Sequence, residues 1–503
     1  MSSRESLQES SEAGRQRGGG MFLTMRVNML LAALAGLALR VLFILKFPAT
    51  DSGDAPFYIE LAWNWLKNRV YGFPIHGVLT PVDMRVPGYP AFVAAIFEFA
   101  GESPMAVMFA QAVLDVVTCF VIALIAARLA PLPHRRRVTL AALWLAALCP
   151  FTANYTAVLL TETLTIFLTA LAILVLLGTE IGVGEDTRRR NSLLNPWFLG
   201  GIVAGLGTLV RPETPLVLLS AGLIALAKWW RPRDWRRLLR AGVLMGIGLV
   251  LPLVPWAARN WKTLHEVRFL APRYSQLPGE FTPHGFIDWT NTWLWRFRDV
   301  YLTLWKLNDE KISIDDIPAS AFDSSEAHAR VSSLLDEYNK TQTIEPDLDA
   351  EFGKLARERT ARHPLRTYLE IPFLRCLTLW FAPRLELLPI SGQLTPVRSE
   401  WEDDRKDFLE TLGLITLNSI YVGLALVGLW VVRRRPCCLL PLVFIVVRTV
   451  FFVYAVETPE PRYVLECFPA LIVLGAQSFT VRFSFLRRAP DEWSPGKSAE
   501  TAL

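Results

Sequence analysis

The sequence is poor in cysteine and histidine, and neither residue type follows a spacing typical of a metal site. The six cysteines among 503 residues lie in or beside apolar runs, and none forms a Cys-x-x-Cys pair. The six histidines include no His-Glu-x-x-His. Disulfide scaffolds and structural zinc sites depend on such spacings. The sequence therefore excludes a disulfide framework and the common zinc sites.

The chain also lacks a long basic segment and a cleavable leader. Its net charge of +5 is spread over short clusters between apolar runs, as the topology signals of membrane proteins are, so we expect no nucleic-acid partner. The first apolar run is too long for a signal peptide and has no small-residue cleavage site. Residues 1–23 are rich in Ser, Gly, Arg and Glu, which predicts a disordered cytoplasmic N-terminus.

Recurrent apolar runs dominate what the chain does contain. Hydrophobic residues make up 52% of the sequence, and the mean hydropathy is +0.32. Most runs have about the 20 residues that a helix needs to cross a bilayer core. They predict an all-α polytopic membrane protein with about 10–11 transmembrane helices. The predicted runs are 25–47, 103–130, 138–158, 160–178, 197–210, 213–229, 239–258, 365–382, 409–432, 437–456 and 463–482.

Clusters of arginine and lysine set the orientation of these helices. Positive charge gathers at 134–137, 188–190, 228–240 and 433–435, and such clusters mark the cytoplasmic side. With this orientation the run 365–382 begins and ends outside, so it either lies in the membrane interface or re-enters. The predicted organisation is an N-terminal transmembrane catalytic module at 24–260 with an exterior loop at 48–102, an exterior cap at 261–364, C-terminal helices at 365–484 and a cytoplasmic tail at 485–503.

The two exterior regions carry aromatic residues. Residues 56–70 predict an amphipathic surface helix whose apolar face holds Phe57, Leu61, Trp65 and Leu66. The Trp-rich run 289–305 is typical of an interfacial belt, and stacking on sugars is the alternative. The acidic segment that follows is long enough for a small helical cap.

The loop after the first run carries a carboxylate and an arginine at the membrane surface. Asp51 and Asp54 precede the predicted helix, and Arg85 precedes the turn Pro87–Pro90. A carboxylate there removes a proton from an acceptor hydroxyl, and an arginine neutralises a departing lipid phosphate. The alternative is that the two acids only solvate the loop or cap the helix.

Four further exterior turns or helix ends carry acids or arginines. The first contributes Glu162, the second Arg211 and Glu213, the third Arg259 and Asn260, and the last Glu457, Glu460 and Arg462. Burying an unpaired acid costs roughly several kcal/mol of free energy. An acid near the bilayer therefore indicates function or a structural ion pair. Together these turns predict a polar cavity open at one membrane face. Arg40, Asp115 and Arg448 fall inside runs and are interpreted as structural, through snorkelling or helix-to-helix ion pairs.

The order of short motifs resembles membrane glycosyltransferases with the C-type fold, in the protein O-mannosyltransferase and lipid A aminoarabinose-transferase superfamily. None of the motifs is specific by itself, and their order along 24–260 and 365–482 carries the resemblance, whereas 260–364 has no matching motif. The motifs are Asp54-x-x-x-Tyr58, Arg85 before Pro87-Gly-Tyr89-Pro90, Thr161-Glu162-Thr163-Leu164, Leu209-x-Arg211-Pro-Glu213, Pro255-Trp-x-x-Arg259-Asn260, and Pro459-x-x-Arg462-Tyr463 followed by Pro469.

The resemblance implies transfer of a sugar from a polyprenyl-phosphate donor to a glycan, lipid or protein acceptor outside the cytoplasm, usually with inversion. It implies an enzyme in the cell (inner or plasma) membrane whose base is Asp54, supported by Glu162. Arg85 and Arg462 would hold the phosphate, with Arg211 and Arg259 as further candidates, and Asp51, Tyr58 and Tyr89 would position acceptor or sugar.

The same resemblance bears on cofactors and on one alternative function. Asp51-Ser-Gly-Asp54 is not the Asp-x-Asp of metal-dependent transferases, so no obligatory metal is expected, although a divalent ion stays possible. The chain lacks a Trp-Trp-Asp motif, which disfavours en bloc glycan transfer. A transporter or flippase of lipid-linked saccharides is the alternative, and it would need midplane ionisable residues and repeat symmetry.

Overall fold

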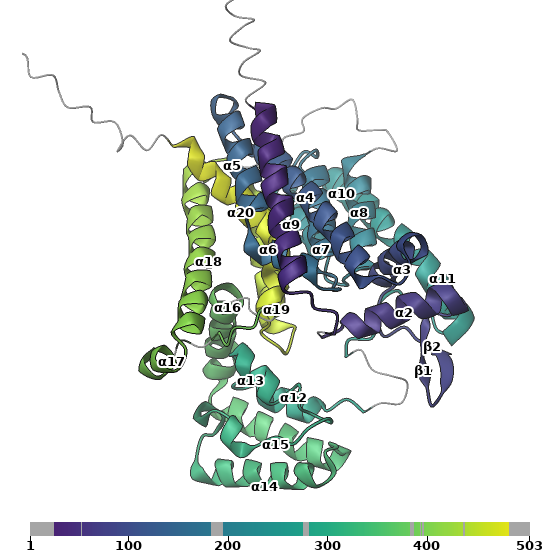
Figure 1. Ribbon diagram of the computed structural model, residues 1–503, viewed down its shortest axis with the longest axis vertical. Coiled ribbons are helices and arrows are strands. Elements are labelled where there is room, and N and C mark those ends of the chain that lie inside the picture. Colours follow the sequence, from purple (N-terminus) through teal and green to yellow (C-terminus); the bar gives the residue numbers. More distant parts are fainter. Residues whose placement is uncertain are drawn as a thin grey trace, which may run out of the picture.

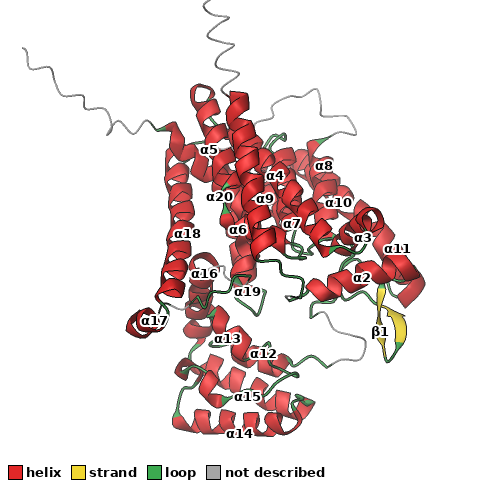
Figure 2. Cartoon of the chain, in the orientation of Figure 1, coloured by secondary structure: helices red, strands yellow, loops and turns green. Residues whose placement is uncertain are grey.

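The computed structural model describes residues 25–51, 53–182, 195–274, 281–382, 387–392, 394, 397–435 and 438–481. Within these ranges the chain is helical apart from one two-stranded antiparallel hairpin (Figure 2). The predicted disordered N-terminus and the predicted tail at 485–503 lie outside the described residues.

Every predicted apolar run contains a helix, although not all of these helices are long enough to cross a membrane. Those that pass by length and composition are Met25–Lys46, α4 (Pro104–Leu129), Trp235–Leu264 with α10 (Trp235–Val250) and α11 (Val254–Leu264), α18 (Arg405–Val432), and Pro461–Thr480 with α20 (Phe468–Ala476). A sixth candidate is the pair α5 (Arg135–Ala147) and α6 (Pro150–Asn154), bent by 42° where Pro150 interrupts the helix. The shorter apolar helices are α3 (Gly88–Ala100), α7 (Glu162–Leu176), α8 (Pro196–Thr208), α9 (Leu216–Trp230) and α19 (Leu439–Tyr454).

The chain is therefore a multi-pass membrane protein with five or six helices of full spanning length among its described residues. A helix of 13–16 residues reaches only about 20–24 Å, less than the bilayer core of about 30 Å. The larger number of crossings expected from the sequence stays a prediction.

The helices run side by side, and the regions predicted to be exterior gather at one end of the bundle (Figure 1). The purple helix Met25–Lys46 descends toward this end, and α18 begins there next to α17 (Val397–Asp403). Inside the bundle Arg40 lies 2.6 Å from Asp115, and both side chains are buried. This pair joins two helices, so the structural interpretation of both residues is confirmed.

The first exterior region is more structured than the sequence predicts. The predicted surface helix forms as α2 (Ala55–Asn68), which buries Leu61 but leaves Phe57 44% exposed. Two further elements follow within the region predicted as loop, the hairpin of β1 (Gly72–Ile75) and β2 (Val78–Pro81) and the apolar helix α3, which packs against α2 and α4.

The cap has a hydrophobic core of its own. It consists of α12 (His284–Asn291), α13 (Phe297–Leu302), α14 (Ser325–Thr341) and α15 (Pro346–Arg362). Trp289 and Trp293 are fully buried in this core beside Phe286 and Phe352. The suggestion that these two tryptophans stack on sugars is therefore wrong, because their rings are inaccessible.

An ion-pair cluster fixes the cap to the chain segment that leaves it. Asp323 lies 2.9 Å from Arg359 and 2.7 Å from Arg366. Burial raises the pKa of Asp323, but the hydrogen bond from Arg366 and the charge of Arg359 outweigh it, so the pKa lies below its ordinary value.

The run 365–382 forms a π-helical turn and then α16 (Ile371–Phe381). With 11 residues, α16 is only about 16 Å long, too short to cross. Its Arg375 donates to the Leu294 carbonyl and to Asn291 Oδ1 of the cap, and Asn418 of α18 donates to the Trp380 carbonyl. The helix thus joins the cap to the bundle, as an interfacial or re-entrant element does.

Candidate active site

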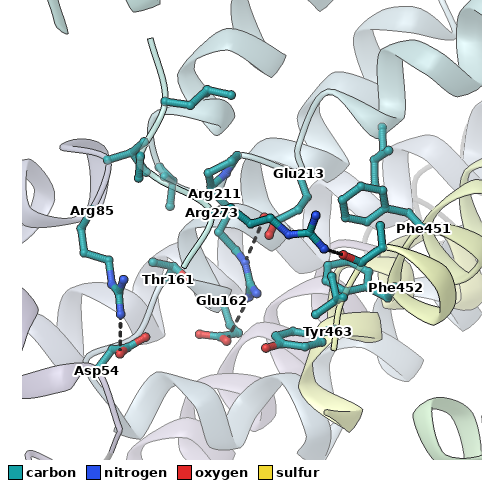
Figure 3. Close-up of a pocket in the computed structure, with 18 of the residues that line it drawn as sticks. Asp54, Arg85, Thr161, Glu162, Arg211, Glu213, Arg273, Phe451, Phe452 and Tyr463 are labelled. Atoms are coloured by element: carbon teal, nitrogen blue, oxygen red, sulfur yellow. Dashed lines mark hydrogen bonds and ion pairs between the residues drawn. The ribbon is translucent and has the colours of Figure 1, made fainter. Parts of the chain in front are cut away.

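A cavity of about 810 Å³ opens where the bundle meets the exterior elements (Figure 3). Six separate chain segments form its wall, and all of them lie at the cap-facing end of the bundle (Figure 1). They are the residue before α2, the segment 84–86, the start of α7, the turn between α8 and α9, the segment 270–273, and the stretch from the end of α19 to Tyr463.

Asp54 and Arg85 form one side of this cavity. Asp54 Oδ1 accepts a hydrogen bond from Arg85 Nη2 at 2.9 Å, and the side chains are 34% and 18% exposed. Asp54 occupies the N-cap position of α2, but its side chain caps no backbone N–H. Helix capping therefore does not explain this acid, and its carboxylate is directed to the cavity instead (Figure 3).

Glu162 and Arg211 form the centre of the wall. Glu162 is the first residue of α7, where the helix dipole favours a negative charge. Its Oε1 accepts from Arg211 Nη1 at 3.0 Å, whereas its buried Oε2 has no hydrogen-bond partner among the described residues. Arg211 also lies 3.2 Å from Glu466 and 3.7 Å from Glu213, so three carboxylates share its charge.

Arg462 also lines the cavity, and Glu460 holds its side chain. Arg462 Nε donates to Glu460 Oε2 at 2.5 Å, and the other Glu460 oxygen accepts from the Tyr463 hydroxyl at 2.6 Å. Arg462 is 19% exposed, and its two terminal nitrogens have no hydrogen-bond partner among the residues that the structure describes. These nitrogens are free to bind an anion.

The electrostatics of the wall keep its arginines charged. Burial lowers the pKa of Arg85, but the charge of Asp54 outweighs it and the pKa is raised. Burial likewise opposes the charge of Arg211, yet Glu466 and Glu162 raise its pKa above the ordinary value. The pKa of the Tyr58 phenol is raised, first by burial and then by Asp54, so this hydroxyl stays protonated and able to donate.

The cavity brings together most of the residues predicted from the sequence. Asp54, Tyr58, Arg85, Glu162, Arg211 and Arg462 all line it. Their positions span more than 400 residues of sequence, and they meet because each follows or precedes a helix at the same end of the bundle (Figure 1).

Arg259, predicted as a further phosphate ligand, lies outside this cavity wall. Its guanidinium donates to the carbonyls of Val82 and Tyr71 and to Asn260 Oδ1. It also lies over the Tyr71 and Trp256 rings, beside a separate apolar cavity of about 440 Å³. Arg259 therefore holds the loop around the hairpin in place, because its donors are used by backbone oxygens.

Tyr89 and Asp51 also lie outside the cavity wall. Tyr89 is fully buried, donates to Gln111 Oε1 at 2.7 Å and packs edge-on against Tyr58 at 5.0 Å, so it can position Tyr58 but cannot contact a substrate. Asp51 is exposed on the loop before α2. Neither residue thus lines the cavity, and the positioning role predicted for each of them stays a prediction.

Two charged residues of this region were missed in the sequence. Arg273 lines the cavity and lies 2.6 Å from Glu457, but it falls in the segment where no motif is found. Glu466 lies behind the wall, 2.6 Å from Arg448 of α19. The signal for Glu466 was its position inside an apolar run, four residues after Arg462.

The same side chains define what the site can do. Among the described residues no three His, Cys, Asp or Glu side chains group as metal ligands do, and a reaction without an obligatory metal stays a prediction. A partly exposed carboxylate and two arginines, Arg85 and Arg462, line one cavity. Such a set can accept a proton at one side of a substrate and stabilise negative charge at the other.

Two solved structures are similar to this chain. The archaeal oligosaccharyltransferase AglB from Archaeoglobus fulgidus, in complex with an inhibitory peptide and a dolichol-phosphate, is 14% identical with a TM-score of 0.47 over 90% of this chain and 50% of its own. ArnT from Cupriavidus metallidurans, bound to undecaprenyl phosphate, is 13% identical with a TM-score of 0.35, and the match covers 89% of this chain and 77% of ArnT. The chain thus spans half the length of the archaeal protein.

The sequence comparison is more local. No protein of curated function matches the chain. Residues 84–256 match the family model described as dolichyl-phosphate-mannose-protein mannosyltransferase. This segment includes Arg85, Glu162 and Arg211 and excludes Asp54 and Arg462. The resemblance to that family of membrane glycosyltransferases, predicted from the order of the motifs, is therefore confirmed for residues 84–256.

Proposed function

We propose that this protein is a membrane glycosyltransferase that moves a sugar from a polyprenyl-phosphate donor to an acceptor hydroxyl at the cap-facing side of the membrane. The observation that carries the proposal is that the ion pair of Asp54 and Arg85 lines the same cavity as Arg462. The family matched by residues 84–256 is described by the same donor class, a lipid phosphate carrying mannose.

Asp54 is the base in this proposal. Its carboxylate takes the proton of the acceptor hydroxyl, and the acceptor oxygen then attacks the anomeric carbon of the donor sugar. The bond from that carbon to the phosphate oxygen breaks, and polyprenyl phosphate leaves with the electron pair. The pairing with Arg85 holds the carboxylate at the cavity wall, where the first step needs it.

Arg462 and Arg85 are the phosphate ligands. Among the described residues, nothing bonds to the two terminal nitrogens of Arg462. Within the same part of the chain, Arg85 uses its terminal nitrogens for Asp54 and the Met84 carbonyl and has no partner at its Nε. Arg211 is a poorer ligand because three carboxylates already surround it. Its role is to hold Glu162, which then orients the sugar or the acceptor.

The apolar part of the wall supports a lipid donor. Leu216 and Leu219 of α9 and Phe451 of α19 line the cavity, and α9 packs directly against α19. Leu219 is 51% exposed, so it borders both the cavity and the outer surface of the bundle. A polyprenyl chain can extend along this side into the bilayer while its phosphate stays in the polar cavity.

The exterior face of the cell membrane is the proposed location of the site. The basic clusters at 228–240, which begins at the end of α9, and at 433–435, before α19, lie at the far ends of two helices that line the cavity, and such clusters favour the cytoplasm. The acceptor, whether glycan, lipid or protein, would then come from the cell envelope.

Mass spectrometry of envelope glycans tests this function in cells. Deletion of the protein is expected to remove one sugar, wild-type protein to restore it, and Asp54→Asn to leave it absent, with Asp51→Asn as the matched control that restores it. Restoration by Asp54→Asn would contradict the proposed base and favour transport of a lipid-linked saccharide. A glycan profile unchanged by deletion would contradict a role in envelope glycosylation.

A further inference from the structure

A chain of alternating charges extends from the cavity wall into the bundle. It begins at Glu162, continues through Arg211 and Glu466, and ends at Arg448. The joining distances are 3.0, 3.2 and 2.6 Å. Glu162 and Arg211 line the cavity, whereas Glu466 and Arg448 do not.

The two inner members are completely buried. Glu466 and Arg448 have no exposed side-chain surface, and Arg448 Nε donates to the Tyr463 carbonyl at 2.8 Å. The charges of the two acids and the two arginines in this series of ion pairs cancel. A balanced set is the condition under which buried charges persist, because an unpaired ion in a low-dielectric interior is strongly unfavourable.

Glu466 and Glu162 compete for the guanidinium of Arg211. The same nitrogen, Arg211 Nη1, contacts both acids, so Glu466 draws the guanidinium backward while Glu162 draws it toward the cavity. Glu162 consequently uses only one oxygen, and its Oε2 has no hydrogen-bond partner among the described residues. That uncommitted oxygen belongs to a residue of the cavity wall.

We propose that Glu466, backed by Arg448, is a positioning residue that anchors Arg211 so that Glu162 is held in the wall with one carboxylate oxygen left for a substrate hydroxyl. This inference rests on the proposed function and assigns a role to a residue that never touches the substrate. It predicts an effect on the rate of transfer more than on binding of the lipid phosphate, because Arg85 and Arg462 are not members of the charge chain.

The experiment compares three variants with a matched control in full-length purified protein. Glu466→Gln removes the charge, Glu466→Asp retains it on a shorter side chain, and a double variant combines Arg448→Gln with Glu466→Gln. Asp115→Asn is the control, because the Arg40–Asp115 pair is equally short at 2.6 Å and equally buried but lies away from the cavity.

Glu466→Gln is expected to lower kcat about 100-fold, as a displacement of about 1 Å at a reacting group does, while the Kd for undecaprenyl phosphate changes less than about threefold. Glu466→Asp is expected to recover part of kcat. The double variant is expected to regain the thermal stability lost by Glu466→Gln, since no buried arginine is left unpaired, but not its kcat. Asp115→Asn is expected to lose stability and keep kcat per folded molecule.

Two results would overturn the proposal. One is recovery of kcat together with stability in the double variant, and the other is an equal loss of kcat in Asp115→Asn, since either would make the effect purely structural. If wild-type protein transfers sugar and Glu466→Gln does so at the same rate, this proposal alone is wrong. If wild-type protein neither binds undecaprenyl phosphate nor transfers any sugar, the proposed function fails and the positioning role fails with it.

Discussion

Replacing Asp54 with asparagine removes the proposed base and leaves the size of the side chain unchanged. The amide can still accept a hydrogen bond from Arg85, but it cannot take a proton from an acceptor hydroxyl. The substitution therefore separates proton transfer from the shape of the cavity wall.

The magnitude follows from the chemistry and from the exposure of the ion pair. A positioned general base contributes about 10²–10⁴-fold to the rate, and a factor of 100 corresponds to about 2.7 kcal/mol of barrier. The Asp54–Arg85 pair is partly exposed, at 34% and 18%, and such pairs contribute about 1 kcal/mol or less to stability. Asp54→Asn is thus expected to slow transfer at least about 100-fold with little loss of folded protein.

Single-turnover transfer from a labelled polyprenyl-phosphate sugar measures this directly, with thermal unfolding of the same samples as the stability readout. Asp51→Asn, an exposed acid three positions earlier and outside the cavity, is the matched control and is expected to react at the wild-type rate. A rate for Asp54→Asn within about threefold of wild type would refute the assignment of the base.

Three other substitutions test the phosphate site, the cap and the close approach of Gly88 to the Leu209 carbonyl. Arg462→Gln is expected to weaken undecaprenyl phosphate binding about tenfold or more, measured as Kd, and Arg259→Gln is not; equal losses would contradict the phosphate assignment. Because the pKa of Asp323 is lowered on folding, its stabilisation of the cap is present above about pH 4 and is lost as the pH falls further. Asp323→Asn is expected to abolish that pH dependence and to destabilise the cap by about 3 kcal/mol, measured by hydrogen exchange. An unchanged pH dependence would contradict the pairing. Gly88→Ala places a Cβ 2.5 Å from a backbone oxygen and is expected to lower the stability measured by thermal unfolding by about 1–3 kcal/mol. Gly222→Ala, whose Cβ would have nothing within 4 Å, is expected to leave that stability unchanged. Equal effects of the two substitutions would contradict the close approach.

Hydropathy and charge predict much of this fold because the bilayer imposes a simple rule on each segment. A chain in lipid must satisfy its backbone by helix formation, so each apolar run contains a helix, although α7, α8, α9, α16 and α19 are shorter than a full span. The hairpin and α3 were missed for a common reason. The sequences of two short strands and of a 13-residue apolar helix look like those of an exterior loop that returns to the membrane.

The site was only partly predictable for a different reason. The positions of Asp54 and Arg85 follow from their closeness to the ends of elements, and the cavity does bring them together. Sequence proximity to a motif could not distinguish Arg462, which faces the cavity, from Arg259, whose donors are used by backbone carbonyls. Nor could it reveal Glu466, since one of its partners lies in α19 and the other in the turn between α8 and α9.

The most direct test of the central claim is the appearance of free polyprenyl phosphate when purified protein, reconstituted in lipid vesicles, is given polyprenyl-phosphate-linked hexoses or pentoses and an envelope extract as acceptor. The account predicts that wild-type protein releases polyprenyl phosphate and transfers the sugar with one of these donors, and that Asp54→Asn protein of equal stability does neither. If folded wild-type protein moves the intact donor across the vesicle membrane and never cleaves its sugar–phosphate bond, the protein is a transporter and the account is contradicted.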